Sequence, residues 1–378
     1  MLKPPFCPNS DCPFHTAPPT ATRWYHIAGS YETLAFGTVT RFKCLACGKT
    51  FGEQTFRLDY YAKRKLSYQR IFEHITNCGG IRATARIMGV NHSAISNRIG
   101  RMARQAIAVQ AKLMDGFVPK EHLVTDGFES FVSDQYQPNN IHLLTGKESQ
   151  FLFTYDYAHL RRKGRMTTQQ KEERKYREKN YIRERRTIYQ SFRQIVAMVE
   201  EFALRREDQV TRLYSDKKKE YRLVLAESEE LQKLSKLNRF YHLTFSSELK
   251  RTILNPLFSV NYYDREVRKD NADHVRETVR FSRNVNSALE RFAVYQLYHN
   301  YFKPYRIVHN DRKLYTHAEA AGLDPQRIEK ILKNIFTMRK FFTHVKLSLN
   351  WSQMLIWARM TGTLDKHDGV FWPKYVWM

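Results

Sequence analysis

The sequence predicts a multidomain α/β protein, in which a mixed β-sheet core follows two small N-terminal modules and precedes a helical C-terminal part. Three observations support this prediction. Four cysteines are paired near the N-terminus, a helix-turn-helix pattern follows them, and short strand patterns alternate with helical patterns from residue 121 onwards. The chain has 378 residues, which is enough for about two to four domains. The expected domains are residues 1–56, 57–117, 118–310 and 311–378.

The chain is strongly basic, with a formal net charge of +25. A field of this sign attracts polyanions and favours nucleic acid as the partner, with anionic lipid or a merely basic surface as alternatives. No apolar run of roughly eighteen residues is present, so we expect no membrane-spanning helix. The N-terminal segment lacks the apolar region of a secretion signal. These features predict a cytoplasmic protein associated with the nucleoid.

Four of the five cysteines form two close pairs: Cys7 with Cys12, and Cys44 with Cys47. Each pair can offer two thiolates to one ion, and zinc favours four such ligands in a tetrahedron. Gly48 follows the second pair, where the turn needs a left-handed residue. The strand-like segments around the second pair predict a small zinc ribbon with a structural zinc. The alternative is four reduced cysteines without metal. His15 is expected at the surface rather than as a ligand.

A helix-turn-helix pattern follows a basic linker at residues 57–67. Helices are expected at residues 68–77, 81–88 and 93–104, the last extending to about Gly116, and glycines mark the turns between them. Side chains expected to be exposed on the last helix are types that hydrogen-bond to bases and phosphates: His92, Ser93, Ser96, Asn97, Arg98 and Arg101. With the basic flanks, this pattern favours DNA binding over a small helical packing module.

The central region reads as three strands, a long helical stretch, a strand, a helix, a strand and a helix. The strands are expected at residues 123–131, 141–144, 151–157, 210–214 and 241–245. Within the helical stretch, residues 161–186 hold twelve Lys or Arg against four Asp or Glu, and residues 188–204 are amphipathic. The basic part is either a solvated face or a DNA contact. The order of elements is that of an RNase H-like fold.

Three aspartates are placed where this order would bring them together. Asp126 lies at the first strand, Asp216 closes the fourth, and Asp264 begins the helix after the last strand. Divalent ions such as Mg²⁺ or Mn²⁺ prefer oxygen ligands, and two of them can assist in-line displacement at phosphorus. Ion-paired or solvated acids are the alternative reading. Nearby basic residues would serve phosphates or balance these acids: Arg265, Arg268, Lys269, Arg276, Arg280 and Arg283.

Several motifs resemble a DDE/D transposase of a bacterial insertion sequence over roughly residues 7–310. They are CPNSDC…CLAC, GGIRATARIMGVNHSAISNRI, TDGFESF, LYSD and NPLFSVNYYDREVRKDNADHVRETVRFSRN. The resemblance implies an RNase H-like catalytic domain in which Asp126, Asp216 and Asp264 hold two Mg or Mn ions. It also implies cleavage and transfer of double-stranded DNA, at the transposon ends and target, by a homodimer on paired ends.

The third acid departs from the commonest form of this family, because it is an aspartate with other acids close by. Glu266 and Glu277 compete with Asp264 for this role, and Asp156 competes with the first two aspartates. A non-catalytic DNA-binding regulator of the same architecture and a host nuclease with the same core are the alternative functions.

The C-terminal part is expected to be helical and aromatic. An aromatic helix should end near Pro304, because a helix rarely continues into the residue before proline. Helices are then expected at residues 317–322 and 325–336. The tail that follows holds Trp351, Trp357, Trp372 and Trp377, and core packing is favoured over a dimer surface.

Overall fold

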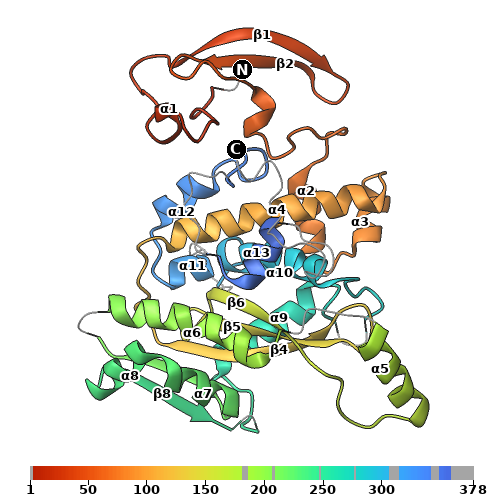
Figure 1. Cartoon of the computed structure of the whole chain (residues 1–378), viewed down its shortest axis with the longest axis vertical. Coiled ribbons are helices and arrows are strands. Elements are labelled where there is room, and N and C mark those ends of the chain that lie inside the picture. The colour runs from red at the N-terminus through yellow and green to blue at the C-terminus, as the bar shows by residue number, and fades with distance from the viewer. Residues whose placement is uncertain are drawn as a thin grey trace, which may run out of the picture.

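The computed structural model describes residues 3–180, 186–206, 209–246, 248–275, 278–305, 315–341 and 349–358. Figure 1 shows an elongated molecule with the N-terminal sheet at one end, a layer of helices in the middle and a larger sheet at the other end. Four residues named above lie outside the described part of the chain: Arg276, Glu277, Trp372 and Trp377.

The N-terminal module is a small antiparallel sheet with its own aromatic core. Its strands are β1 (Tyr25–Thr33), β2 (Gly37–Cys44) and β3 (Thr50–Gly52), in the order β1-β2-β3, with the one-turn helix α1 (Pro13–Thr16) and the 3₁₀ helix η1 (Glu53–Phe56) beside them. Trp24 stacks on Phe51, and Phe42 and Phe56 also pack against the ring of Phe51. These rings and three of the cysteines form a cluster separate from the main core.

Three helices follow, at the positions that the sequence predicts. They are α2 (Tyr68–Ile75), α3 (Ile81–Ile87) and α4 (His92–Met114). The side chains of Ser67 and Asn91 accept hydrogen bonds from the first turns of α2 and α4, which is the usual N-cap role of Ser and Asn. Gly89 supplies a left-handed residue (φ +63°) in the turn before α4. The apolar face of α4 packs on α10, so these helices share one hydrophobic core with the rest of the chain.

The larger sheet is mixed and has five strands, in the order β6-β5-β4-β7-β8. They are β4 (Leu123–Phe131), β5 (Pro138–Gly146), β6 (Leu152–His159), β7 (Thr211–Asp216) and β8 (Phe240–Phe245). The pairs β4–β5 and β5–β6 are antiparallel, whereas β4–β7 and β7–β8 are parallel. All five strands lie within a few residues of their expected positions. Strands β5 and β6 are buried over almost their whole length, so helices cover both of their faces.

Two helices separate β6 from β7. The basic helix α5 (Thr168–Asn180) projects from the body of the molecule (Figure 1), and its charged residues form ion pairs, Arg177 with Glu173 in the helix and Glu178 with Arg161 before it. Helix α6 (Ile188–Arg205) buries Phe192, Ile195 and Val199 against the sheet, as its periodicity predicts.

Between β7 and β8, one helix was expected at residues 226–237, and the structure has two. They are α7 (Lys219–Glu227) and α8 (Glu229–Lys236). Ser228 ends the first and caps the second, because its hydroxyl accepts a hydrogen bond from the backbone of Leu231.

The C-terminal part completes the helical layer with α9 (Phe258–Asp270), α10 (Val285–Tyr301), α11 (His317–Ala320), α12 (Pro325–Leu332) and α13 (Trp351–Ala358). Helix α10 lies between α4 and the sheet (Figure 1) and ends before Pro304, as predicted. Trp351 stacks on Tyr157, and Trp357 is buried against Phe341, so core packing of these two tryptophans is confirmed. In the described part of the chain, no helix combines the length and apolar character needed to cross a membrane.

Candidate functional site

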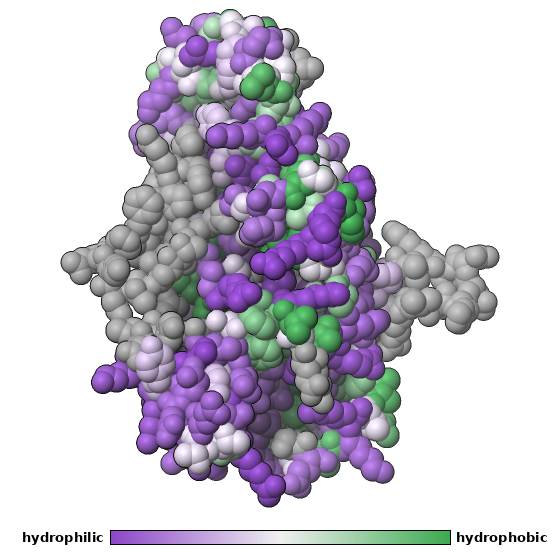
Figure 2. Space-filling view, turned by 90° about the vertical axis from the view of Figure 1, so that its right-hand side faces the viewer, coloured by the Kyte–Doolittle hydropathy of each residue, from purple (hydrophilic) through white to green (hydrophobic). Residues whose placement is uncertain are grey.

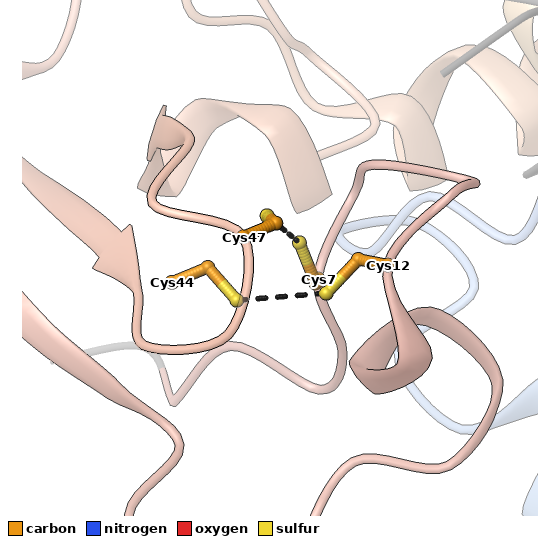
Figure 3. Close-up of side chains that lie close together, drawn as sticks. All are labelled: Cys7, Cys12, Cys44 and Cys47. Carbon is orange, nitrogen blue, oxygen red and sulfur yellow. Dashed lines mark hydrogen bonds between the residues drawn. The ribbon is translucent and has the colours of Figure 1, made fainter.

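The four paired cysteines converge in the N-terminal module (Figure 3). The Sγ atoms of Cys7 and Cys47 lie 3.7 Å apart, as do those of Cys12 and Cys44, and all four lie within 4.8 Å of one another. A Zn–S bond of about 2.3 Å gives a tetrahedral edge of about 3.8 Å, so these separations fit a zinc ion. The four cysteines could therefore bind a structural zinc, in agreement with the sequence.

The turn at the second pair supports this arrangement. Gly48 has φ +67°, and its amide donates to the carbonyl oxygen of Cys44 at 3.1 Å. Burial acts to raise the pKa of Cys47, but hydrogen bonds from the Lys49 amide and the neighbouring thiols lower it to about 7. His15 is buried rather than at the surface as expected, because its Nδ1–H donates to the carbonyl oxygen of Cys7 at 2.7 Å.

Asp126 and Asp216 are brought to the same place by the parallel pairing of β4 and β7. Leu123 pairs with Leu213, and each aspartate lies three residues beyond its paired leucine. The ladder ends one pair after these leucines, so both carboxylates lie where the two strands stop pairing. Asp126 lies inside β4, because this strand continues alongside β5 to Phe131, as the strand expected at residues 123–131 requires.

Asp264 reaches the same region from α9. It was expected at the beginning of this helix and lies in its middle, because α9 starts as early as Phe258. All three aspartates line one cavity of about 560 Å³. The cavity is also lined by four cations and two polar residues: Lys218, Arg251, Arg265, Arg268, Asn261 and Tyr262. The fold therefore brings together the three acids singled out in the sequence.

Lys218 bridges two of the three acids. Its Nζ atom lies 3.2 Å from Oδ1 of Asp126 and 3.4 Å from Oδ2 of Asp216, and its amide donates to Oδ1 of Asp216 at 3.2 Å. Its side chain is half-buried and lies over the ring of Tyr221. Sequence reasoning did not single out this lysine. The only sequence feature that could have indicated it is the basic run Lys217–Lys219 directly after Asp216. Such a run is equally typical of a solvated turn.

Two of the three aspartates lie in surroundings that disfavour the charged form of a carboxyl group. Burial, and then the charge of Asp126, raise the pKa of Asp264 to about 8. The Oδ1 atom of Asp264 is buried and has no hydrogen-bond partner among the described residues. Burial also raises the pKa of Asp216, although Lys218 acts against it. Neutral carboxyl groups are the lower-energy state in such a place unless a cation compensates them.

The three aspartates are less tightly clustered than the cysteines. Among the described residues, only the four cysteines bring their ligand atoms within 4.8 Å of one another in a group of three or more. The aspartates therefore surround a cavity rather than form one compact ligand set.

The competing acids are engaged elsewhere. Glu266 and Asp270 both accept hydrogen bonds from Lys303, and Glu266 does not line the cavity. Asp156 is buried against Arg186 and accepts hydrogen bonds from Ser352. Glu277 lies outside the described residues. Of these candidates for the third acid, Asp264 is therefore the one that lines the cavity; Glu129 of β4, which the sequence did not single out, lines it as well.

The basic residues near α9 divide into two groups. Arg265 and Arg268 line the cavity, and the latter also donates to the carbonyl oxygen of Glu129 at 2.8 Å. Lys269 lies 3.6 Å from Glu266, and Arg280 donates to the carbonyl oxygen of Cys78, so both have structural partners. Arg251 lines the cavity and was not expected there, because it lies in an irregular segment without a motif.

In the helix-turn-helix region, some of the side chains expected to be exposed are at the surface, but two arginines pack inwards. His92, Ser93 and Asn97 are exposed and Ser96 is half-buried. Arg98 was expected to be exposed but is buried, because it donates to the carbonyl oxygens of Arg64 and Ala94.

Arg101 was also expected to be exposed and is half-buried. Its guanidinium donates to the carbonyl oxygens of Leu58 and Tyr60 at 3.1 and 2.8 Å and lies 4.0 Å from the centre of the Tyr60 ring. Both arginines therefore attach α4 to the segment that precedes α2.

No protein-family model matches this sequence, and comparison with curated proteins finds no match either.

Proposed function

We propose that this chain is a DNA transposase of the DDE/D kind, which binds insertion-sequence ends and catalyses metal-dependent strand cleavage and strand transfer. One observation carries the proposal: Asp126, Asp216 and Asp264 come from distant parts of the chain to one cavity with a cationic rim. A phosphodiester is anionic, and the four cations that line the cavity beside its acids suit a phosphate that reacts next to bound dications.

The architecture supports an RNase H-like assignment for the core. Along the chain, three antiparallel strands are followed by helices, a parallel strand, a helix pair, a second parallel strand and a helix. This is the element order that the sequence led us to expect of such a core, with acids on the first strand, the fourth strand and the last helix.

The residues present fit divalent ions. Carboxylate oxygens are the ligands that Mg²⁺ and Mn²⁺ prefer, and the buried Oδ1 of Asp264 has no other partner among the described residues. When bound, such ions would activate the attacking oxygen and stabilise the leaving one. The chain's own contribution would be to hold the carboxylates, with Arg251, Arg265 and Arg268 placed to orient the phosphate.

DNA recognition is proposed for the N-terminal part of α4. His92, Ser93, Ser96 and Asn97 occupy the first turns of this helix, where side chains of helix-turn-helix proteins reach bases and phosphates. Figure 2 shows that hydrophilic side chains cover most of the face of the molecule on which α3 and α5 lie. A homodimer on paired ends would bring two such surfaces to the DNA.

The test is cleavage and joining of element-end DNA with Mg²⁺ by Asp126→Asn, Asp216→Asn and Asp264→Asn. An amide keeps the size of the carboxylate but removes the charge that holds a dication, so each variant should lose both reactions and keep DNA binding. Glu266→Gln is the matched control on the same helix and should remain active. Normal activity of both Asp126→Asn and Asp216→Asn would rule the proposal out.

A second candidate function is a non-catalytic DNA-binding regulator. The observation that favours it is Lys218, which balances Asp126 and Asp216 without any metal. In that case the wild type would bind DNA but neither cleave nor join it. A nuclease would cleave without joining, so one assay that follows both products separates the three functions.

A further inference from the structure

A second cavity, of about 590 Å³, lies far along α4 from the helix-turn-helix. Its walls come from Pro5 and Phe6 of the N-terminal module, from the C-terminal half of α4, and from α12 with the segment up to residue 340. The cations that line it are Lys112, Arg327, Lys330, Lys333, Arg339 and Lys340. No Asp or Glu is among the described residues that line it. We refer to it as the basic cleft.

Four of these cations have no acidic partner. In the described part of the chain, Lys112, Lys330, Lys333 and Lys340 form no ion pair. Burial, and then the charge of Lys112, lower the pKa of Lys340. Like charges gathered in this way oppose folding unless an anion compensates them, so the cleft is suited to an anionic partner.

The walls of the cleft are held in place by hydrogen bonds. Gln105 of α4 donates to the carbonyl oxygens of Ile335 and Met338 at 2.7 Å and accepts from the amide of Lys340 at 2.7 Å. Arg327 donates to the carbonyl oxygens of Lys112 and Asp115, where α4 ends. The cations therefore keep their spacing before a ligand arrives, which lowers the entropic penalty of binding.

We propose that the basic cleft binds the phosphodiester backbone of double-stranded DNA, at a second position beyond the helix-turn-helix. The proposal rests on the proposed function for its choice of DNA. Residues 92 and 112 are both on α4, and a rise of about 1.5 Å per residue separates them by about 30 Å. This is close to one turn of B-DNA, about 34–36 Å, and the helical rotation of about 100° per residue places the two side chains on different sides of α4, so the cleft would be a separate contact.

The test compares two triple variants that each remove three positive charges. The cleft variant carries Lys112→Ala, Lys330→Ala and Lys333→Ala, three exposed lysines at the cleft. The control variant carries Arg222→Ala, Lys233→Ala and Lys236→Ala, three exposed residues of α7 and α8. Each single cleft substitution is measured too, so a folding defect in the triple variant would not hide the effect.

Binding is followed by fluorescence anisotropy of a random duplex of about 40 base pairs, over about 50–300 mM NaCl and without divalent ions. Each phosphate that the protein no longer neutralises should lower the salt slope by about 0.9. The cleft triple variant should therefore show a slope smaller by about 2–3 and an affinity about tenfold weaker near 100 mM salt. The control variant should keep both the salt slope and the affinity within about twofold of the wild-type values.

An unchanged salt slope in the cleft variant, or an equal loss in the control, would overturn the proposal. So would a loss confined to vesicles containing phosphatidylserine or to inorganic tripolyphosphate, which would assign the cleft to a membrane or to a small polyphosphate. The assay reads no cleavage. A failure of the transposase mechanism would therefore leave the result interpretable, and a failure at the cleft would leave the aspartate site untouched.

Discussion

The ammonium group of Lys218 lies 3.2 Å from Oδ1 of Asp126, and both residues of this ion pair line the cavity of the candidate site. The same group lies 3.4 Å from Asp216. Two of the three acids proposed as metal ligands thus share one internal cation. A dication that binds these acids must compete with Lys218, so this lysine should tune metal affinity.

Replacing Lys218 by methionine should make the site bind Mn²⁺ more tightly. The substitution leaves Asp126 and Asp216 uncompensated, so the metal-free variant should melt at a lower temperature than the wild type. A charged hydrogen bond contributes about 1.5–3 kcal/mol, so the Mn²⁺ concentration that half-restores stability should fall by about ten- to hundredfold. Thermal unfolding over a Mn²⁺ titration measures this shift.

Lys219→Met is the control for this prediction. Lys219 is the exposed neighbour, and it pairs with neither aspartate. It should leave the Mn²⁺ dependence unchanged. The same dependence in both variants would show that Lys218 does not compete with metal.

The contribution of Asp264 to the stability of the metal-free protein should fall as the pH rises from about 4 to 8. The pKa of Asp264 is about 8 in the folded chain, against an ordinary value of 3.8, so the folded state holds a proton that the unfolded state has released. The slope for one proton is at most about 1.4 kcal/mol per pH unit. Asp264→Asn should flatten the urea-unfolding profile in this window, and an identical slope in both proteins would contradict the assignment.

Metal binding should show the opposite pH dependence. A carboxyl group must lose its proton to ligate a dication, so Mn²⁺ affinity should rise with pH up to about 8, by about tenfold per unit at most. Isothermal titration calorimetry in buffers of different ionisation enthalpy counts the released proton. Release of no proton at pH 7 would mean that Asp264 does not bind the ion.

Arg98→Ala and Arg101→Ala should lower the free energy of unfolding rather than weaken DNA binding alone. Each arginine donates to backbone carbonyl oxygens that would lose this hydrogen bond, at a cost of about 1–3 kcal/mol. Thermal unfolding should detect the loss in both variants. Asn97→Ala is the counterpart on the exposed side of α4, with weaker DNA binding expected and little change in stability. Unaltered stability of Arg98→Ala would show that its hydrogen bonds contribute nothing.

Cys44→Ser should release the proposed zinc and unfold the N-terminal module. The remaining three thiolates cannot complete a tetrahedral site, and this module has only a small aromatic core of its own. Metal analysis should find one zinc per chain in the wild type and none in the variant. Cys78→Ser is the control, because Cys78 is not part of the cluster. This variant should keep the zinc. A wild-type protein that folds without zinc would exclude a structural metal here.

Much of the local structure follows from the sequence alone. The cysteine spacing within each pair follows from the sequence, because a short loop can fold back to bring two thiols together, whereas the folding of the N-terminal module brings the two pairs to one point. The caps at Ser67 and Asn91 act within one turn of their own helices, and the strands follow from runs of apolar and β-branched residues. These features depend on neighbours within a few residues, so the sequence contains their cause.

The acids show where sequence reasoning stops. Asp264 and Glu266 lie two residues apart on α9, and side chains with that spacing point to different sides of a helix. Only the packing of α9 on the sheet decides that Asp264 meets the cavity while Glu266 meets Lys303. The choice between them depends on a lysine 37 residues away in the chain.

The same reason explains the arginines of α4 and the bridging lysine. Arg98 and Arg101 read as exposed in the sequence, but carbonyl groups 34 to 43 residues earlier in the chain satisfy them. Lys218 reads as part of a solvated basic run, but Asp126, 92 residues away, binds it. A charged side chain takes its partner from whatever the fold brings near. The tertiary structure alone therefore decided which of this protein's many cations have structural partners.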